Sequence, residues 1–137
     1  MNRFFSPSPL WQQDGLFLVR VITGSLIIMH GIEIFEPEIM KNYLSWDTFK
    51  TSAIMPYIGK ASELISGILL FLGLFTRLAC LLIMGTFSYI TFFVGHGKFW
   101  MEDQHPFLFV LLALIFFFTG PVKLSLDHYF FKLKRKY

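Results

Sequence analysis

Three long stretches of this 137-residue chain contain no Asp, Glu, Lys or Arg. They cover residues 64–75, 78–97 and 106–122, which together make up more than a third of the sequence. Only 15% of all residues are charged and 55% are hydrophobic, whereas a soluble domain has about 25% charged and about 45–50% apolar residues. This distribution predicts a polytopic membrane protein and excludes an intrinsically disordered chain.

Four segments are long and apolar enough to cross a bilayer as helices, at about residues 15–35, 57–75, 78–94 and 106–120. We therefore expect an all-α membrane protein in which an antiparallel bundle of four transmembrane helices forms a single domain, residues 1–137. The apolar part of the first segment is too long for a cleavable signal peptide, and no small-x-small cleavage site follows it. This segment is expected to stay in the membrane as a helix.

Two shorter segments mix apolar and polar residues. Residues 38–50 alternate the two kinds, which predicts a short amphipathic helix on the outer surface of the membrane. The tail, residues 123–136, mixes leucine and phenylalanine with lysine and is expected to lie along the inner surface.

Basic residues are divided unevenly between the two ends of such a bundle. With four spans both termini share one side, and that side carries seven Lys or Arg residues against four on the other. Cytoplasmic loops carry the excess of basic residues, so both termini are predicted to be cytoplasmic. The basic tail is explained in this way as a topology signal, and no nucleic-acid partner is expected. The seven are Arg3, Arg77, Lys123, Lys132, Lys134, Arg135 and Lys136, and the four are Lys41, Lys50, Lys60 and Lys98.

Ionisable side chains within a membrane helix cost free energy and are therefore candidates for function. Arg20 and His30 lie in the first predicted span and Glu63 in the second, while Glu33 stands at the rim of the first. Lys60 is close enough to the outer end of its span for its side chain to snorkel to the surface.

Small residues accompany these candidates. At 100° per residue, Gly24 and Gly31 fall on the face of the first helix that carries Arg20. Gly67 shares its face of the second helix with Glu63. Because small residues let membrane helices approach closely, both faces are predicted to look into the bundle.

His30 and Glu63 lie at similar depths, roughly 8–9 Å below the outer boundary at 1.5 Å per residue. One interpretation is an outward-opening polar pocket in which the two side chains exchange a proton or bind the polar head of a small lipophilic ligand. The other is a buried hydrogen-bonded pair that only fixes the register of the helices.

Arg20 has a different environment, because it lies near the cytoplasmic end of its span and can snorkel there. A structural role is expected for it. Its candidate partners are Asp14, Asp127 and backbone carbonyl groups near the inner surface.

Other chemistries find less support in the sequence. His30, His96 and His105 all lie toward the outer side, but no two of them form an i, i+4 pair on one helix, so no metal site is predicted. Neither a Ser-His-Asp set nor a glycine-rich phosphate loop is present in the sequence. The single cysteine, Cys80, cannot form a disulfide within one chain. No catalytic nucleophile or redox cofactor site is recognisable, which disfavours the isolated chain as an enzyme.

Several short patterns resemble the DoxX family of membrane proteins. They are Leu18-Val19-Arg20 with His30-Gly31 in the first span, Glu63 followed by Gly67, the turn Gly73-Leu74-Phe75-Thr76-Arg77, and Gly120-Pro121 followed by Leu124-Ser125-Leu126-Asp127. The resemblance covers nearly the whole chain, and the turn and the closing segment are its most specific parts.

The resemblance implies a four-helix protein of the bacterial inner membrane. The family is named after a subunit associated with a thiosulfate:quinone oxidoreductase, other members are described as membrane partners of redox or sulfur-handling enzymes, and related eukaryotic proteins act as assembly factors. The outer loops, residues 36–56 and 98–104, depart from any family pattern. The positions that match are Arg20, His30, Glu63, Thr76, Arg77 and Asp127.

Two functional hypotheses follow. In the first, the protein is a small membrane subunit that supports a quinone-linked or other redox system, with His30 and Glu63 handling protons or binding a lipophilic ligand such as a quinone. In the second, it is a non-enzymatic scaffold that binds another membrane or envelope protein through its faces and outer loop. In that case Glu63 and Arg20 only stabilise the fold. Independently of this choice, Arg20, Thr76, Arg77 and Asp127 are expected to be structural polar residues.

Overall fold

Four long helices make up most of the protein, whose computed structural model describes residues 3–131. No strand occurs within these residues, which confirms the predicted all-α membrane fold. The π-helical segment η4 continues α4 without a break. The bounds are α1 (Gln12–Ile32), α3 (Ile54–Leu72), α4 (Thr76–Tyr89), η4 (Ile90–Val94) and α5 (Gln104–Thr119).

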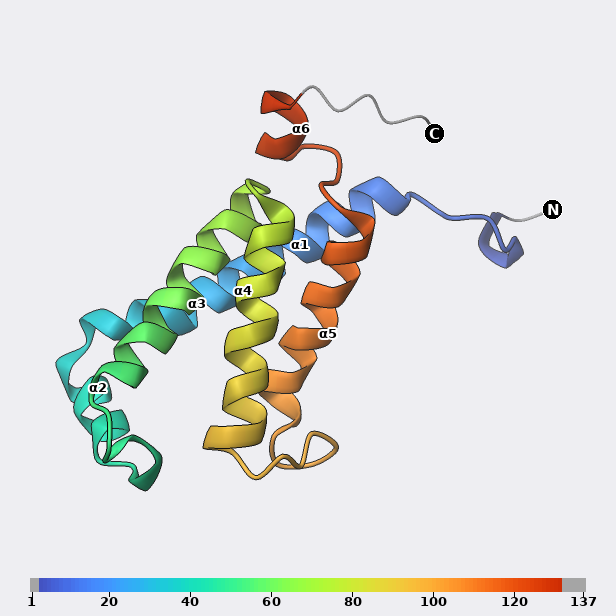
Figure 1. Ribbon diagram of the computed structural model, residues 1–137. Helices are drawn as coiled ribbons and strands as arrows, with labels where there is room; N and C mark the ends of the chain where they lie inside the picture. Colours follow the sequence, from blue (N-terminus) through green and yellow to red (C-terminus); the bar gives the residue numbers. More distant parts are fainter. Residues whose placement is uncertain (1–2, 132–137) are drawn as a thin grey trace.

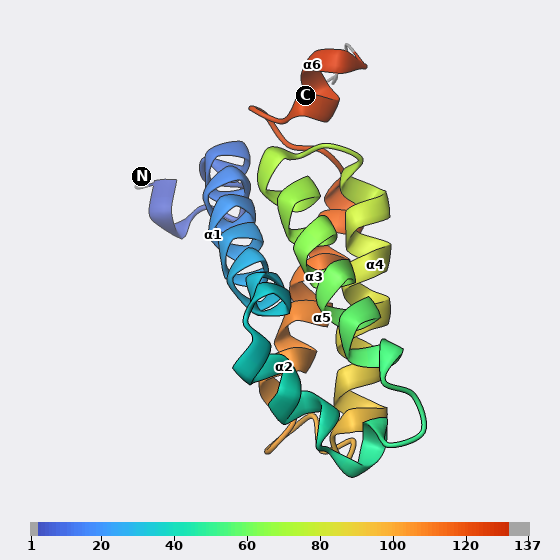
Figure 2. The same cartoon turned by 90° about the vertical axis from the view of Figure 1, so that its left-hand side faces the viewer.

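The long helices pack in a simple order (Figures 1 and 2). α1 packs against α3, α3 against α4 and α4 against α5, while α1 and α5 touch only slightly. The apolar core lies where α1, α3, α4 and α5 meet. Its buried residues include Ile27, Leu70, Ile83, Phe109 and Phe116.

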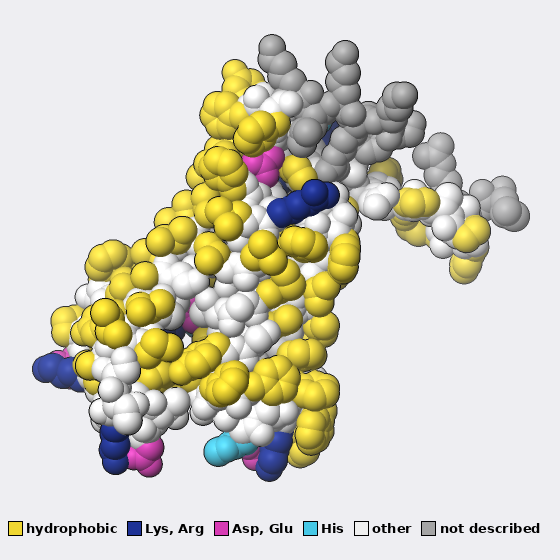
Figure 3. Space-filling model, viewed as in Figure 1, with side chains coloured by type: hydrophobic (Ala, Val, Ile, Leu, Met, Phe, Trp, Pro, Cys, Tyr) yellow, Lys and Arg dark blue, Asp and Glu magenta, His cyan; other side chains and the backbone are white. Residues whose placement is uncertain are grey.

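The outward faces of the helices are apolar, as expected where lipid replaces water. Three of the helices are long and apolar enough to cross a membrane, and these are α1 with its extension, α3, and α4 with η4. α5 is more apolar than these helices but has only 16 residues, about 24 Å at 1.5 Å per residue. Figure 3 shows hydrophobic side chains over the sides of the molecule, with most charged groups toward its ends.

Short helices cover the two ends of the bundle. The predicted outer amphipathic segment forms α2 (Pro37–Leu44) and the 3-10 turn η3 (Asp47–Phe49), which follow the turn η2 (Glu33–Phe35). At the opposite end, α6 (Leu126–Phe130) begins the predicted tail segment. The rest of that tail, from Lys132 onward, lies outside the described residues.

The turn between α3 and α4 falls three residues earlier than the sequence suggested. α3 ends at Leu72 because Gly73 adopts φ 68°, a left-handed conformation that favours glycine. The amide of Leu74 then donates to the carbonyl of Leu69 at 2.9 Å, which closes the helix end. α4 starts directly afterwards, at Thr76 and not at 78.

Glycine residues bring α1 and α3 into close contact, as their positions predicted. A Cβ atom on Gly24 would lie 2.7 Å from the backbone nitrogen of Phe71, and one on Gly67 would lie 2.9 Å from that of Ile28. Gly31 faces the backbone of Leu64 in the same way. Backbone atoms cannot move aside as a flexible side chain can, so these positions set the distance between the helices.

We predict that Gly24→Ala destabilises the bundle by about 1–3 kcal/mol, because the added methyl group must push α1 away from α3. The measurement is the free energy of unfolding in mixed detergent micelles. Gly15→Ala is the matched control, since a Cβ at Gly15 meets nothing within 4 Å. Equal stability of the two variants would contradict the proposed packing constraint.

Candidate functional site

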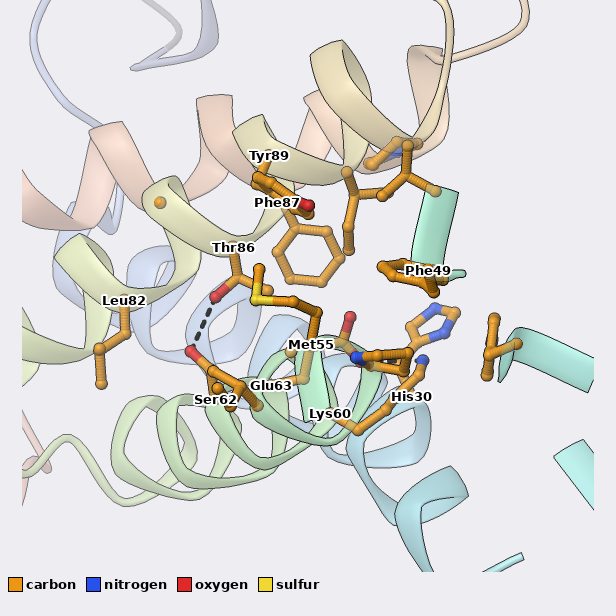
Figure 4. Close-up of a pocket in the computed structure, with 18 of the residues that line it drawn as sticks. His30, Phe49, Met55, Lys60, Ser62, Glu63, Leu82, Thr86, Phe87 and Tyr89 are labelled. Atoms are coloured by element: carbon orange, nitrogen blue, oxygen red, sulfur yellow. Dashed lines mark hydrogen bonds and ion pairs between the residues drawn. The ribbon is translucent and has the colours of Figure 1, made fainter. Parts of the chain in front are cut away.

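A cavity of about 500 Å³ lies between α3 and α4 in the half of the bundle next to α2 (Figure 4). This volume falls within the range of small-molecule binding sites. Its walls are mainly apolar, with a polar cluster at one end. The lining includes His30, Tyr43, Trp46, Phe49, Met55, Ile58, Gly59, Lys60, Ser62, Glu63, Leu81, Gly85, Thr86, Phe87, Tyr89 and His105.

The polar cluster is centred on the ammonium group of Lys60. Its Nζ lies 2.8 Å from Oε2 of Glu33 and 3.0 Å from Oε2 of Glu63. Lys60 is 9% exposed and Glu63 only 2%. When all three groups are ionised, two carboxylates share one cation, so the cluster carries a formal charge of −1.

The partner of Glu63 differs from the predicted one. Lys60 lies one helical turn before Glu63, at i, i+3, and its side chain turns inward to the carboxylate where snorkelling was expected. Burial of an unpaired carboxylate costs more free energy than burial of an ion pair, which explains the inward orientation. Within residues 3–131, no hydrogen bond or ion pair joins Glu63 to His30.

The outer segment supplies another polar residue that sequence reasoning missed. Tyr43 of α2 donates a hydrogen bond of 2.8 Å to Oε2 of Glu33, and its ring lies 4.9 Å from Nζ of Lys60. Burial, followed by the hydrogen bond to Glu33, raises the pKa of Tyr43. The phenol therefore stays protonated, and remains a donor, throughout the physiological pH range.

His30 lies in the same cavity but contacts a different set of rings. Its ring centroid is 5.5 Å from that of His105 and 6.0 Å from that of Phe109, both in edge-on arrangements. His105 lies in α5 and His30 in α1, so this wall of the cavity combines the first and the last of the long helices. The third histidine considered, His96, is exposed in the loop after η4. Among the described residues, no three His, Cys, Asp or Glu side chains are placed to hold a metal ion.

Away from Lys60, the cavity wall carries uncharged polar and apolar side chains. Ser62 of α3 and Thr86 of α4 share a hydrogen bond of 2.7 Å across the helix interface. Figure 4 shows this pair and Leu82 at the end of the cavity away from His30 and Lys60. η4 contributes Ile90 and Val94 to the wall, and the amide of Gly95 donates to the carbonyl of Ile90 five residues earlier, as in a π-helix. Such π-helical segments are frequent at functional sites.

The second polar cluster lies at the other end of the bundle, around Arg20. This side chain is 1% exposed, so it is buried where snorkelling was expected. Its Nη2 donates to the carbonyl of Leu124 at 2.9 Å, which is one of the inner carbonyl partners considered from the sequence. The guanidinium also lies 5.3 Å from the ring of Phe17. Leu124 takes a left-handed backbone conformation, φ 60°, in presenting this carbonyl.

Asp127 connects the same cluster to the start of α4. Its carboxylate accepts hydrogen bonds from the amides of Phe75 at 2.6 Å and Thr76 at 2.7 Å. Both amides belong to the first turn of the helix, where no intrahelical acceptor is available. The amide of Asp127 donates to the carbonyl of Gly73 at 2.9 Å, so the turn and the tail bind each other in both directions. Arg77, in contrast, is exposed and lies outside this cluster.

We predict that Lys60→Met costs about 3–5 kcal/mol of stability, because it leaves two carboxylates beside each other without their cation. The free energy of unfolding in detergent measures the effect. Lys98→Met is the control, since Lys98 forms an exposed ion pair, at 4.0 Å, with Glu102. Adding Glu63→Met to Lys60→Met should recover part of the loss. If Lys60→Met were as stable as Lys98→Met, the ion-pair cluster would contribute nothing to the stability of the fold.

We predict that Asp127→Asn destabilises the inner end by about 1–2 kcal/mol, because the charged cap of α4 and its attraction to Arg20 are lost. Protease cleavage in the segment after α5 should become faster at the same time. Asp14→Asn tests the same substitution at an exposed position of α1. Unchanged cleavage in Asp127→Asn would contradict the role given to this carboxylate.

Comparison with known proteins gives two relatives of similar length. A Bacillus subtilis (strain 168) protein described as "Putative oxidoreductase CatD" is 30% identical over 129 residues, which cover 88% of this chain and 90% of that protein. An uncharacterized protein of Haemophilus influenzae (strain ATCC 51907 / DSM 11121 / KW20 / Rd) is 30% identical over 127 residues, covering 85% of this chain and 91% of its own length. No solved structure matches the chain.

The sequence model of the DoxX family matches residues 15–96. This range contains α1, α3 and α4 together with the cluster around Lys60. It begins three residues into α1 and ends just after η4. The family resemblance read from the sequence is thereby confirmed, and the chain belongs to the DoxX family.

Proposed function

We propose that this protein is an accessory subunit of a redox system in the bacterial cytoplasmic membrane, and that its outer cavity binds a lipophilic ligand such as a quinone. The observation that carries the proposal is the ion-pair cluster at one end of an apolar cavity, in which Lys60 and Glu63 are buried and Glu33 is partly exposed. Ionisable groups at this depth are expensive in a membrane protein and are generally kept for a function.

The chemistry of the cavity fits such a ligand. Apolar walls accommodate a hydrocarbon ring or chain, while a few polar groups at one end orient the head. Glu63 uses Oε2 for Lys60, and its Oε1 makes no hydrogen bond to any residue that the structure describes. This oxygen is therefore a candidate acceptor for a proton or a hydrogen bond from a bound head group.

The link to redox chemistry rests on sequence similarity to a relative. The description of the Bacillus subtilis relative names an oxidoreductase. We assign binding and proton handling to this chain and the electron transfer itself to a partner protein. The residues assigned to the ligand are His30, Lys60 and Glu63, with Tyr43 holding Glu33 in place.

We also propose that both termini face the cytoplasm. The start of α1 and the short helix α6 lie at one end of the bundle, and α2 lies at the other (Figures 1 and 2). The side of the termini carries seven Lys or Arg residues against four on the other side, and this excess supports a cytoplasmic location of the termini. The cavity would then open on the outer half of the membrane.

The test is extraction of lipophiles from the purified protein, followed by mass spectrometry. We expect the wild type to retain a quinone, and Glu63→Gln to retain about tenfold less, a loss of about 1.4 kcal/mol in binding, because its neutral amide is a weaker acceptor. Glu102→Gln is the matched control, since Glu102 is exposed in the outer loop.

The result separates the two functional hypotheses. No retained quinone in the wild type, together with normal activity of the partner system in Glu63→Gln, would overturn the ligand-binding proposal. A protein partner that co-purifies equally well with both variants would then favour a scaffold.

A further inference from the structure

The cavity reaches the lateral surface of the protein, the surface that lipid covers in a membrane. Ile58 of α3 and Leu81 of α4 line the cavity and are 52% and 53% exposed, respectively. A side chain that is at once exposed and cavity-lining stands at an opening. On the face shown in Figure 3, a hollow lies between the regions of α3 and α4, and acidic side-chain surface is visible inside it.

Two glycines leave space between the helices at this opening. Gly59 of α3 and Gly85 of α4 both line the cavity, and a Cβ on either would meet nothing within 4 Å. This contrasts with Gly24, Gly31 and Gly67, where helix backbones fill the space. The glycines of the opening are therefore not required for helix packing, and the gap that they leave belongs to the cavity.

Aromatic side chains cover the cavity from the side of the outer loop. Phe49 of η3 is buried, and its ring stacks on Trp46 with the centroids 6.2 Å apart. Trp46 in turn contacts Tyr43 edge-on at 4.9 Å. All three rings line the cavity. Packed rings thus lie over the loop side of the cavity, although Trp46 is 39% exposed, while the side chains between α3 and α4 at Ile58 and Leu81 are more than half exposed.

The charge at the polar end restricts the head group. When all three groups are ionised, Glu33 and Glu63 together carry two negative charges against the one positive charge of Lys60, whose Nζ lies within 3.0 Å of both. An anionic head, such as a carboxylate, would add a third negative charge in a site of low dielectric constant and would be repelled. A hydroxyl group can instead donate a hydrogen bond to Glu63 without adding charge.

We propose that the cavity takes an uncharged, hydroxyl-bearing lipophile sideways from the outer leaflet, between α3 and α4, and discriminates against anionic amphiphiles. This inference rests on the proposed ligand-binding function and adds the route and the class of head group. A reduced quinone, with its two hydroxyl groups, is one member of that class.

The test uses two probes with the same chain and ring but different polar groups, para-dodecylphenol and para-dodecylbenzoate, added to the protein in lipid nanodiscs. Native mass spectrometry counts the adducts. We expect the wild type to bind the phenol at least about tenfold better than the carboxylate. Gly59→Leu and Gly85→Leu should lose the phenol adduct, because the new side chain fills the opening. Gly15→Leu should keep it, since Gly15 is equally open but lies far from the cavity in α1.

The route is tested by the rate of phenol uptake. Ile58→Trp with Leu81→Trp enlarges two side chains at the opening and should slow uptake about tenfold or more. Ile65→Trp with Leu78→Trp is the matched control, because these residues are 54% and 52% exposed on the same two helices but do not line the cavity.

Each outcome bears on a different step. Equal uptake by the two double variants would overturn the lateral route, and equal binding of para-dodecylbenzoate would overturn the selection of the head group. Failure of the wild type to bind the phenol would overturn the whole inference. If the wild-type protein nevertheless retained a quinone that Glu63→Gln does not retain, the proposed function would still hold without this further inference.

Discussion

The contact between α1 and α3 is the constraint on which the rest of the structure depends. Gly24, Gly31 and Gly67 let the two backbones approach to a distance that no larger residue would permit. Because lipid is as apolar as the helices, such close packing replaces the hydrophobic effect as the force that joins them. The same contact carries Glu33, just after α1, to Lys60 on α3, so the ion-pair cluster is a consequence of the glycine packing.

The polar groups gather at two levels of the bundle and serve different purposes. At the end of the bundle next to α6, Arg20 and Asp127 bind backbone groups of segments that would otherwise leave carbonyls and amides unsatisfied in an apolar environment. Toward the opposite end, next to α2, the side chains of Lys60 and Glu63 bind each other beside a cavity. The first arrangement joins the segment after α5 to the turn between α3 and α4, and the second lines the cavity. The adjacent cavity makes the cluster of Glu33, Lys60 and Glu63 the candidate site.

Much of the fold and part of the site could be predicted from the sequence. The apolar segments predicted the four long helices to within three residues at each end. α3 ends early because Gly73 adopts a left-handed conformation, and α1 and α3 each begin three residues before the predicted start. Helical periodicity placed Glu63 on an inward face. The inward position of Lys60 was not predicted, although its i, i+3 spacing to Glu63 was a usable signal. A lysine near a helix end can extend outward to water or inward to a carboxylate, and helical periodicity does not distinguish the two. Tyr43 and His105 offered no local signal, since their partners are distant in sequence.

The sequence by itself determined that this is an all-α membrane protein, which helix faces turn inward and which glycines permit close packing. These properties follow from composition and from the fixed geometry of one helix, 100° and 1.5 Å per residue. Only the tertiary structure decided that Lys60 bridges Glu33 and Glu63, that His30 faces His105, and that the cavity opens between α3 and α4. The physical reason is that each of these depends on the rotation and separation of two helices, which are fixed by packing along their whole length and not by any local pattern.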